Sequence, residues 1–146
     1  MDRYKSAGKA SFTTAEIAAM AHIPGKELAK TVIIKIDGKM AMTVLPASFR
    51  IDFDELKKAL SVKNIELATE TDFEEYFADC EVGAMPPFGN LYQLDVYVAE
   101  SLAEDEDITF NACSHRELIK LAYKDFDKLV KPKVKKFSYQ YSLIYR

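Results

Sequence analysis

Two runs of apolar, mostly β-branched residues dominate the first half of the chain and predict a β-hairpin. Residues 31–36 read Thr-Val-Ile-Ile-Lys-Ile, residues 40–45 form a second apolar run, and Asp37 and Gly38 stand between them. An Asp-Gly pair between two such runs is typical of a tight hairpin turn, because both turn positions need positive φ. We expect Pro46 to close the hairpin, since proline has no N–H to donate to a sheet.

Helix start signals surround this hairpin. In each case a Ser, Thr or Asp residue is followed three positions later by Glu and then by apolar residues at helical spacing, which is the pattern of an N-terminal cap. The predicted pairs are Thr13 with Glu16, Asp52 with Glu55, and Thr71 with Glu74. We expect the three helices to end before residues 22–25, at residue 60 and at residue 77.

The remaining pattern predicts short strands near residues 65–67, 92–99 and 108–112. Residues 80–90 hold two glycines and two prolines and are predicted to be irregular. After residue 112 two readings are open: Ser114 and Glu117 could cap a helix, or a strand over 117–121 could precede a helix over 125–130. The alternation in residues 137–143 predicts an added strand or a dimer contact. Interleaved strands and helices indicate an α/β or α+β fold with a mixed sheet.

Composition narrows this to an ordinary globular domain. The chain has 146 residues, of which 49% are hydrophobic and 29% charged, so we expect one domain over residues 1–146. No run of about eighteen apolar residues suggests a membrane span, and the N-terminus lacks the apolar region of a secretory signal, so we expect a cytoplasmic protein. Cys80 and Cys113 are too few for a disulfide framework and are interpreted as reduced thiols.

Charge limits the partners. The formal net charge is −3, whereas proteins that coat duplex nucleic acid carry a basic excess, so we exclude DNA and expect any nucleic acid to be met over a small footprint. Acidic residues dominate residues 66–107. Lysines form two clusters, at Lys26, Lys30, Lys35 and Lys39 and at Lys131, Lys133, Lys135 and Lys136. The second cluster is interpreted as a solvated surface.

Three places carry candidate chemistry. Lys30 stands at the start of the first hairpin strand, where an apolar wall could hold it against an anionic or carbonyl ligand. The run from Gly83 to Gly89 could bring backbone N–H groups close to a carbonyl group. Ser114 and His115 follow a strand, but neighbours in sequence have poor geometry for a nucleophile and its base. With His22 and His115 as its histidines and no metal-binding motif, the chain is expected to need neither metal nor cofactor.

Taken in order, these features resemble the YbaK/ProX family of trans-acting aminoacyl-tRNA deacylases, free-standing relatives of the editing domain in bacterial prolyl-tRNA synthetases. The matching elements are Lys30-Thr31, the Asp-Gly turn with Pro46, Gly83-x-x-x-Pro87-Phe88-Gly89, and Asn111-Ala112-x-Ser114-His115. The similarity runs over residues 14–132. It implies a mixed, barrel-like β-sheet with helices packed outside, and it favours the strand over residues 117–121.

The resemblance also implies an activity. Members hydrolyse mischarged aminoacyl-tRNA, here a small amino acid such as alanine on tRNA(Pro), with the substrate's own ribose hydroxyl assisting water. Lys30 matches the family's essential lysine, placed near the terminal adenosine and the ester. The partner is the acceptor 3′ end of tRNA, with an aminoacyl-tRNA synthetase as a further candidate and no membrane. The implied substrate-binding residues are Thr31, Gly83, Ala84, Met85, Pro87, Phe88, Gly89, Asn111, Ser114 and His115.

Two positions depart from the family pattern. Cys113 stands where relatives commonly have glycine, and Leu118 stands where the YbaK branch has aspartate. The cysteinyl-tRNA specificity of that branch is therefore not carried over, and the loop resembles the alanyl-tRNA-deacylating subgroup more closely. The alternative function is a non-catalytic module on the same fold that binds tRNA, a nucleotide or a synthetase.

Overall fold

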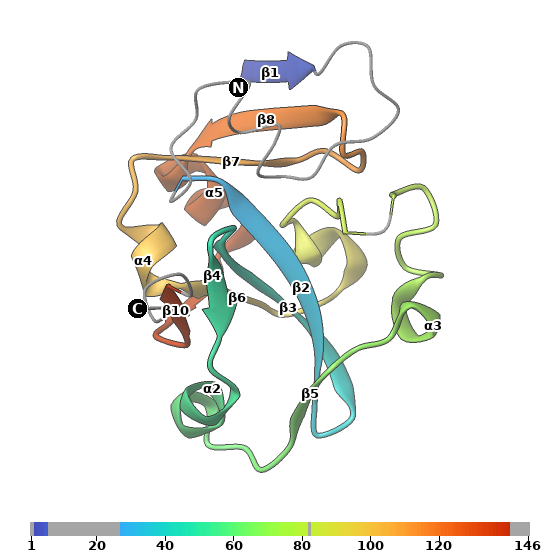
Figure 1. The fold of residues 1–146 in the computed structure, drawn as a ribbon, viewed down its shortest axis with the longest axis vertical. Helices are drawn as coiled ribbons and strands as arrows, with labels where there is room; N and C mark the ends of the chain where they lie inside the picture. The colour runs from blue at the N-terminus through green and yellow to red at the C-terminus, as the bar shows by residue number, and fades with distance from the viewer. Residues whose placement is uncertain (1, 6–26, 82, 141–146) are drawn as a thin grey trace, which may run out of the picture.

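The computed structural model describes residues 2–5, 27–81 and 83–140, which form a mixed α+β fold (Figure 1). The strands are β1 (Asp2–Lys5), β2 (Ala29–Ile36), β3 (Lys39–Pro46), β4 (Phe49–Ile51), β5 (Ile65–Leu67), β6 (Val96–Ala99), β7 (Asp107–Asn111), β8 (Glu117–Ala122), β9 (Lys133–Lys135) and β10 (Ser138–Gln140). The helices are α2 (Phe53–Leu60), α3 (Glu70–Phe73), α4 (Glu100–Ala103), α5 (Tyr123–Val130) and a 3-10 turn, η1 (Gly89–Tyr92). The predicted α+β class is confirmed.

The β2–β3 hairpin is confirmed and forms the centre of the fold. The two strands pair antiparallel over their whole length, from Ala29 with Pro46 to Ile36 with Lys39. Asp37 and Gly38 both have positive φ, of 48° and 87°, as the Asp-Gly turn requires. Pro46 is the last residue of β3, so the strand ends where proline was expected to end it.

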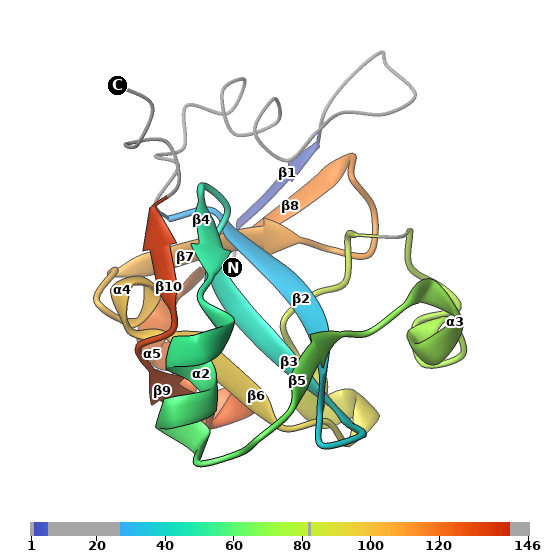
Figure 2. The same cartoon turned by 60° about the horizontal axis from the view of Figure 1, so that its bottom comes forward.

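The hairpin belongs to a five-stranded sheet in the order β5-β2-β3-β6-β9 (Figure 2). Strands β3, β6 and β9 run parallel, whereas β2 is antiparallel to both of its neighbours. A three-stranded sheet, β1-β8-β7, adjoins it through a bridge between Leu28 and Thr109, and β10 pairs with β4 in a third sheet. The strand chosen for residues 117–121 is confirmed as β8, and part of the alternating tail forms β10.

Apolar side chains pack on both faces of the five-stranded sheet. On one face Ile33, Met42 and Val98 join the helix α5 residue Phe126 in the first cluster. On the other face Leu45 and Tyr97 pack with α2, with strand β4 and with Phe137, which precedes β10, in the second cluster. Because both faces are buried, the strands read as nearly continuous apolar runs rather than as a strict alternation. No helix within the described part of the chain could span a membrane.

The observed helices match the predictions from the sequence in part. Asp52 caps α2 by accepting from the Glu55 N–H at 3.0 Å, as predicted. The cap predicted at Thr71 and Glu74 is wrong, because Thr69 is the N-cap of α3, which ends at Phe73. The helix predicted from Thr13 lies outside the described residues.

Two boundaries also differ. The strand predicted over residues 92–99 is wrong in its first half, because Gln93 adopts a left-handed conformation with φ of 60° and ends η1. That turn also adds a short 3-10 segment to the end of the stretch expected to be irregular. The strand therefore begins only at Val96.

Candidate functional site

Lys30 lies on β2, and its side chain is on the face of the sheet that packs in the second cluster. It pairs with Leu45 of β3, a member of that cluster. Burial is the main cause that lowers the pKa of the Lys30 ammonium group, and the nearby positive charge of Arg50 on β4 lowers it further. Because a desolvated cation acts strongly on an anionic ligand, Lys30 suits a site that receives a phosphate or a developing oxyanion. Thr31, the next residue along the strand, is buried and lies on the opposite face.

The loop around Gly83 is held against the turn that follows β7. The Glu81 N–H donates to the Cys113 carbonyl oxygen at 2.9 Å, and the Cys113 N–H donates to the Ala84 carbonyl oxygen at 2.9 Å. The His115 N–H donates to the Glu81 carboxylate at 2.6 Å. The structure therefore brings together two sequence-predicted segments that lie about thirty residues apart.

Gly83 is the point of closest approach in this arrangement. Its φ is +83°, and a Cβ atom there would lie 3.4 Å from Cε1 of His115. The backbone N–H groups of Gly83 and Met85 make no hydrogen bond to any described residue. Within residues 83–85, the N–H groups of Gly83 and Met85 thus differ from that of Ala84, which donates to the Glu81 carbonyl oxygen at 3.0 Å.

Other residues of the predicted loop serve packing. Phe88 lies edge-on to Phe110 at 5.4 Å and to Phe126 at 6.0 Å between ring centroids, so it plugs the first cluster. Gly89 is buried, and a Cβ there would lie 2.6 Å from Val96 Cγ2. Pro87 is also buried. These contacts support a structural role for Phe88 and Gly89 and leave the N-terminal half of the loop as the part that can meet a ligand.

Asn111 and Ser114 shape the turn at the end of β7. The Asn111 side-chain amide donates to the Ser114 carbonyl oxygen at 3.3 Å, and the Ser114 hydroxyl accepts from the Arg116 N–H at 3.0 Å. The His115 N–H is the largest of the influences that lower the pKa of the Glu81 carboxyl. The contacts of these side chains hold the turn, and Glu81 is the residue of this network that the sequence analysis missed.

Cys80 and Cys113 form a disulfide, so their interpretation as reduced thiols is wrong. The two residues are 33 positions apart, and the fold brings their Cα atoms within 4.2 Å, a closeness that spacing in the sequence does not disclose. Cys113 has φ of 66°, a left-handed conformation that explains why glycine suits this position. Leu118, which pairs with Asn111, is fully buried.

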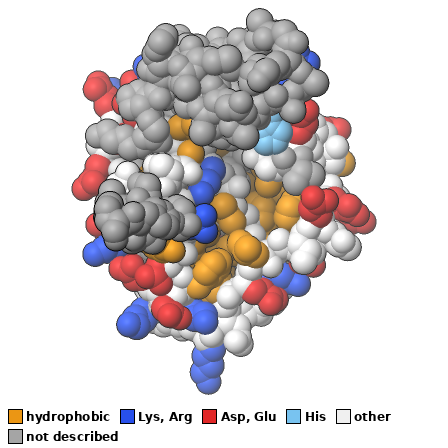
Figure 3. All heavy atoms as spheres, in the orientation of Figure 1, with side chains coloured by type: hydrophobic (Ala, Val, Ile, Leu, Met, Phe, Trp, Pro, Cys, Tyr) orange, Lys and Arg blue, Asp and Glu red, His pale blue; other side chains and the backbone are white. Residues whose placement is uncertain are grey.

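An apolar pocket of about 390 Å³ adjoins the loop on the side of α3. Its floor is made by Phe73, Phe77, Cys80 and Met85, and its rim carries the carboxylates Glu70, Glu74 and Glu75. Figure 3 shows acidic side chains gathered on the α3 side, while basic side chains lie beside an apolar stretch near the centre of this face. Such a rim favours a cationic group, such as an α-ammonium, and disfavours phosphate.

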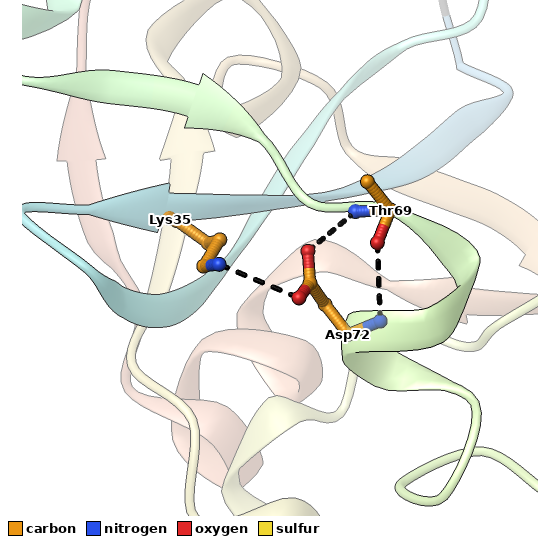
Figure 4. Close-up of polar contacts among 3 residues, drawn as sticks. All are labelled: Lys35, Thr69 and Asp72. Carbon is orange, nitrogen blue, oxygen red and sulfur yellow. Dashed lines mark hydrogen bonds and ion pairs between the residues drawn. The ribbon is translucent and has the colours of Figure 1, made fainter.

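Helix α3 is fixed to the hairpin through Asp72 (Figure 4). The Thr69 N–H donates to the Asp72 carboxylate at 2.8 Å, and the Asp72 N–H donates to the Thr69 hydroxyl at 3.2 Å. Lys35 of β2 lies 3.4 Å from the same carboxylate. The hydrogen bonds from Thr69 are the main cause that lowers the Asp72 pKa, and Lys35 lowers it further.

We expect this network to make α3 sensitive to acid. A carboxylate whose folded-state pKa lies below its ordinary value of 3.8 stabilises the fold above that value, and the contribution is lost as the pH falls through the folded-state pKa. Asp72→Asn should therefore lower the free energy of unfolding at pH 7 and change it little near pH 2. Urea unfolding at both pH values checks this, and Asp79→Asn, an exposed residue of the same segment, is the control. An equal loss at both pH values would contradict it.

The predicted residues therefore fall into two groups. Gly83, Met85, Asn111, Ser114 and His115 form one cluster, whereas Lys30 contacts β3 and β4. Among the described residues, no hydrogen bond or ion pair joins Lys30 to that cluster. The described part of the chain holds no group of three His, Cys, Asp or Glu side chains suited to a metal ion. Arg50 was not singled out from sequence, although an arginine between Phe49 and Ile51 is the pattern of a strand residue that faces outward.

Solved structures share this fold. A candidate trans-editing enzyme for prolyl tRNA synthetase superposes with a TM-score of 0.82 at 16% identity, over 94% of this chain and 85% of that one. A hypothetical protein designated APE2540 superposes with a TM-score of 0.81 at 20% identity, over 94% and 91% of the two chains. No curated protein matches the sequence.

The sequence itself matches a family model over most of its length. The model describes the aminoacyl-tRNA editing domain and matches residues 9–129. That range contains Lys30, the loop around Gly83 and the turn around His115. The chain belongs to the aminoacyl-tRNA editing domain family.

Proposed function

We propose that the protein is an aminoacyl-tRNA deacylase that hydrolyses the ester of mischarged tRNA in trans. The observation that carries the proposal is the editing-domain match over residues 9–129, which spans a loop with two backbone donors at Gly83 and Met85. The most fitting substrate is a small amino acid such as alanine on tRNA(Pro). The likeness to a structure described as a candidate trans-editing enzyme for prolyl tRNA synthetase supports this choice.

Two parts of one substrate account for the two groups of site residues. Lys30 binds the terminal adenosine end, whose phosphate is negatively charged, and the Gly83 loop binds the aminoacyl group. An aminoacyl ester is already activated, so water can attack it once it is oriented, with the free ribose hydroxyl of the substrate assisting. The N–H groups of Gly83 and Met85 then donate to the developing oxyanion, an electrostatic contribution worth about 10²–10³ in rate for one donor.

The turn around His115 sets the position of these donors. It holds the loop through the bonds between Cys113 and Ala84 and between His115 and Glu81. The acidic rim of the neighbouring pocket attracts the α-ammonium group of the amino acid. The products are the free amino acid and uncharged tRNA, and no covalent intermediate on the protein is needed.

A non-catalytic module that binds tRNA, a nucleotide or a synthetase is the second candidate. It is favoured by Phe88 and Gly89, because their packing roles account for part of the loop pattern without catalysis. The two functions differ in turnover, since a binding module retains tRNA without releasing the amino acid.

A panel of mischarged tRNAs identifies the substrate. Purified protein is incubated with labelled Ala-tRNA(Pro), Cys-tRNA(Pro), Ser-tRNA and Ala-tRNA(Ala), and the release of amino acid is followed. We expect Ala-tRNA(Pro) to be hydrolysed fastest, although one methylene changes binding by only about 1–3 kcal/mol. Release at the spontaneous rate from every substrate, together with retained tRNA binding, would support the binding module instead.

A further inference from the structure

The end of the chain carries an unbalanced positive charge. Residues 128–146 contain six basic residues and no acidic one, although the whole chain has a formal charge of −3. Four of these, which we call the lysine edge, lie on or beside β9: Lys131, Lys133, Lys135 and Lys136. Among the described residues, no ion pair joins any of these four lysines to a carboxylate.

Strand register places two residues of the lysine edge, Lys133 and Lys135, on the same sheet face as Lys30. Lys30 pairs with Leu45, and Ala99 pairs with Lys135. Leu45 and Ala99 each follow directly on the paired residues Val44 and Val98, so they lie at the same level of two parallel strands, and both belong to the second cluster. The ammonium group of Lys133 lies 5.5 Å from the ring centroid of Tyr97, another member of that cluster. The register and this contact thus place the side chains of Lys133 and Lys135 on the face of the second cluster.

The outer surface between these two points is also suited to nucleic acid. Figure 2 shows β9 leading into β10, which lies beside β4. Arg50 of β4 pairs with Tyr139 of β10, and both side chains are exposed. A cation beside an exposed aromatic ring is the combination with which proteins hold unpaired nucleotides. The Arg50 charge is close enough to Lys30 to act on it electrostatically.

The distance fits the end of a tRNA. Lys30 and Lys135 are three strand spacings apart, which is roughly 14 Å. At the rise of one stacked strand this distance spans about four nucleotides, the length of the unpaired 3′ end that every tRNA carries. With the terminal adenosine at Lys30, the phosphates at the junction with the acceptor stem lie at the lysine edge.

We propose that the lysine edge binds the acceptor-stem phosphates of tRNA and that Arg50 and Tyr139 guide the unpaired 3′ end from there to Lys30. The inference rests on the proposed function, because it takes the tRNA 3′ end as the ligand of Lys30. It gives the protein a narrow basic track in place of a broad basic surface. The acidic rim near α3 lies on the other side of the site, where its carboxylates repel phosphates and so favour this track.

The test is binding of a non-aminoacylated RNA hairpin that reproduces the acceptor stem and 3′ end, measured by fluorescence anisotropy at several salt concentrations. The variant carries Lys133→Gln, Lys135→Gln and Lys136→Gln. We expect it to bind about tenfold or more weakly at low salt and to lower the slope of log K against log salt by about 2–3, because three phosphate contacts are lost. The matched control replaces Lys39, Lys58 and Lys63, three exposed lysines outside the lysine edge, and should bind like the wild type.

A second variant, Lys136→Glu, reverses one exposed charge and guards against a folding defect in the first. Equal affinity and equal salt slope in wild type and both variants would overturn the proposal, as would the absence of RNA binding by the wild type. Because the RNA carries no amino acid ester, the result does not depend on catalysis. If RNA binding depends on the lysines but no amino acid is released, the binding surface is supported and the deacylase proposal is contradicted. If amino acid is released but RNA binding does not depend on the lysines, the deacylase proposal is supported and the binding surface is contradicted.

Discussion

Lys30→Ala is expected to lower the rate of deacylation by about 10²-fold, because an adenosine end that is no longer held lets the ester move away from its donors, and a misplacement of about 1 Å is enough for a loss of this size. Lys30 is half-buried beside Arg50, so its loss leaves a site in which the terminal nucleotide is no longer held. Because the effect concerns the reacting complex, kcat should fall more than KM rises. Single-turnover and steady-state rates on the preferred aminoacyl-tRNA separate the two.

Two further variants make the result specific to this position. Lys30→Arg keeps the charge but not the shape of the ammonium group, and should recover only part of the rate. Lys39→Ala removes an exposed lysine from the far end of the same hairpin and should keep the full rate. A Lys30→Ala protein that unfolds at the wild-type temperature and hydrolyses at the wild-type rate would show that Lys30 has no part in catalysis.

Gly83→Ala is expected to lower the rate by about 10–100-fold with a small loss of stability. Gly83 has φ of +83°, where a Cβ atom strains the backbone and would lie 3.4 Å from His115. The strain costs about 1–2 kcal/mol, and relief of that strain shifts the N–H groups of Gly83 and Met85. A misplacement of about 1 Å at a reacting centre is enough for a 10²-fold loss.

Gly38→Ala is the matched control, because the same strain arises there without a site. Gly38 has φ of +87°, and a Cβ atom there meets nothing within 4 Å. The two variants should lose similar free energies of unfolding in urea, while only Gly83→Ala loses deacylation. Equal activity in both variants would show that the conformation of the Gly83 loop does not matter to catalysis.

The central hairpin was predictable because every local signal agreed. Apolar β-branched runs, the Asp37-Gly38 turn and Pro46 all favour the same pairing. The cap of α3 was not, since Thr69 with Asp72 and Thr71 with Glu74 differ little as local patterns. Long-range contacts decide between them: Asp72 lies 3.4 Å from Lys35, and Thr69 directly follows the residue whose N–H bonds to Ile33.

The candidate site was predictable in its parts but not in its assembly. The family resemblance pointed to the loop and to the turn that follows β7. Hydrogen bonds between Glu81, Cys113 and Ala84 hold these two segments together. Sequence could not show that Phe88 packs against Phe110 and Phe126, because an aromatic residue in a loop fits a core plug and a stacking platform equally well.

Catalytic hydrolysis differs from tRNA binding because one enzyme molecule releases many amino acid molecules, and a turnover number measures this. A small amount of wild-type protein is mixed with a large excess of labelled Ala-tRNA(Pro), and released alanine is counted per protein molecule against the spontaneous release in buffer. We expect many alanine molecules per protein and a release rate well above that of buffer alone. Release at the buffer rate, from a protein that still binds the tRNA, would contradict it.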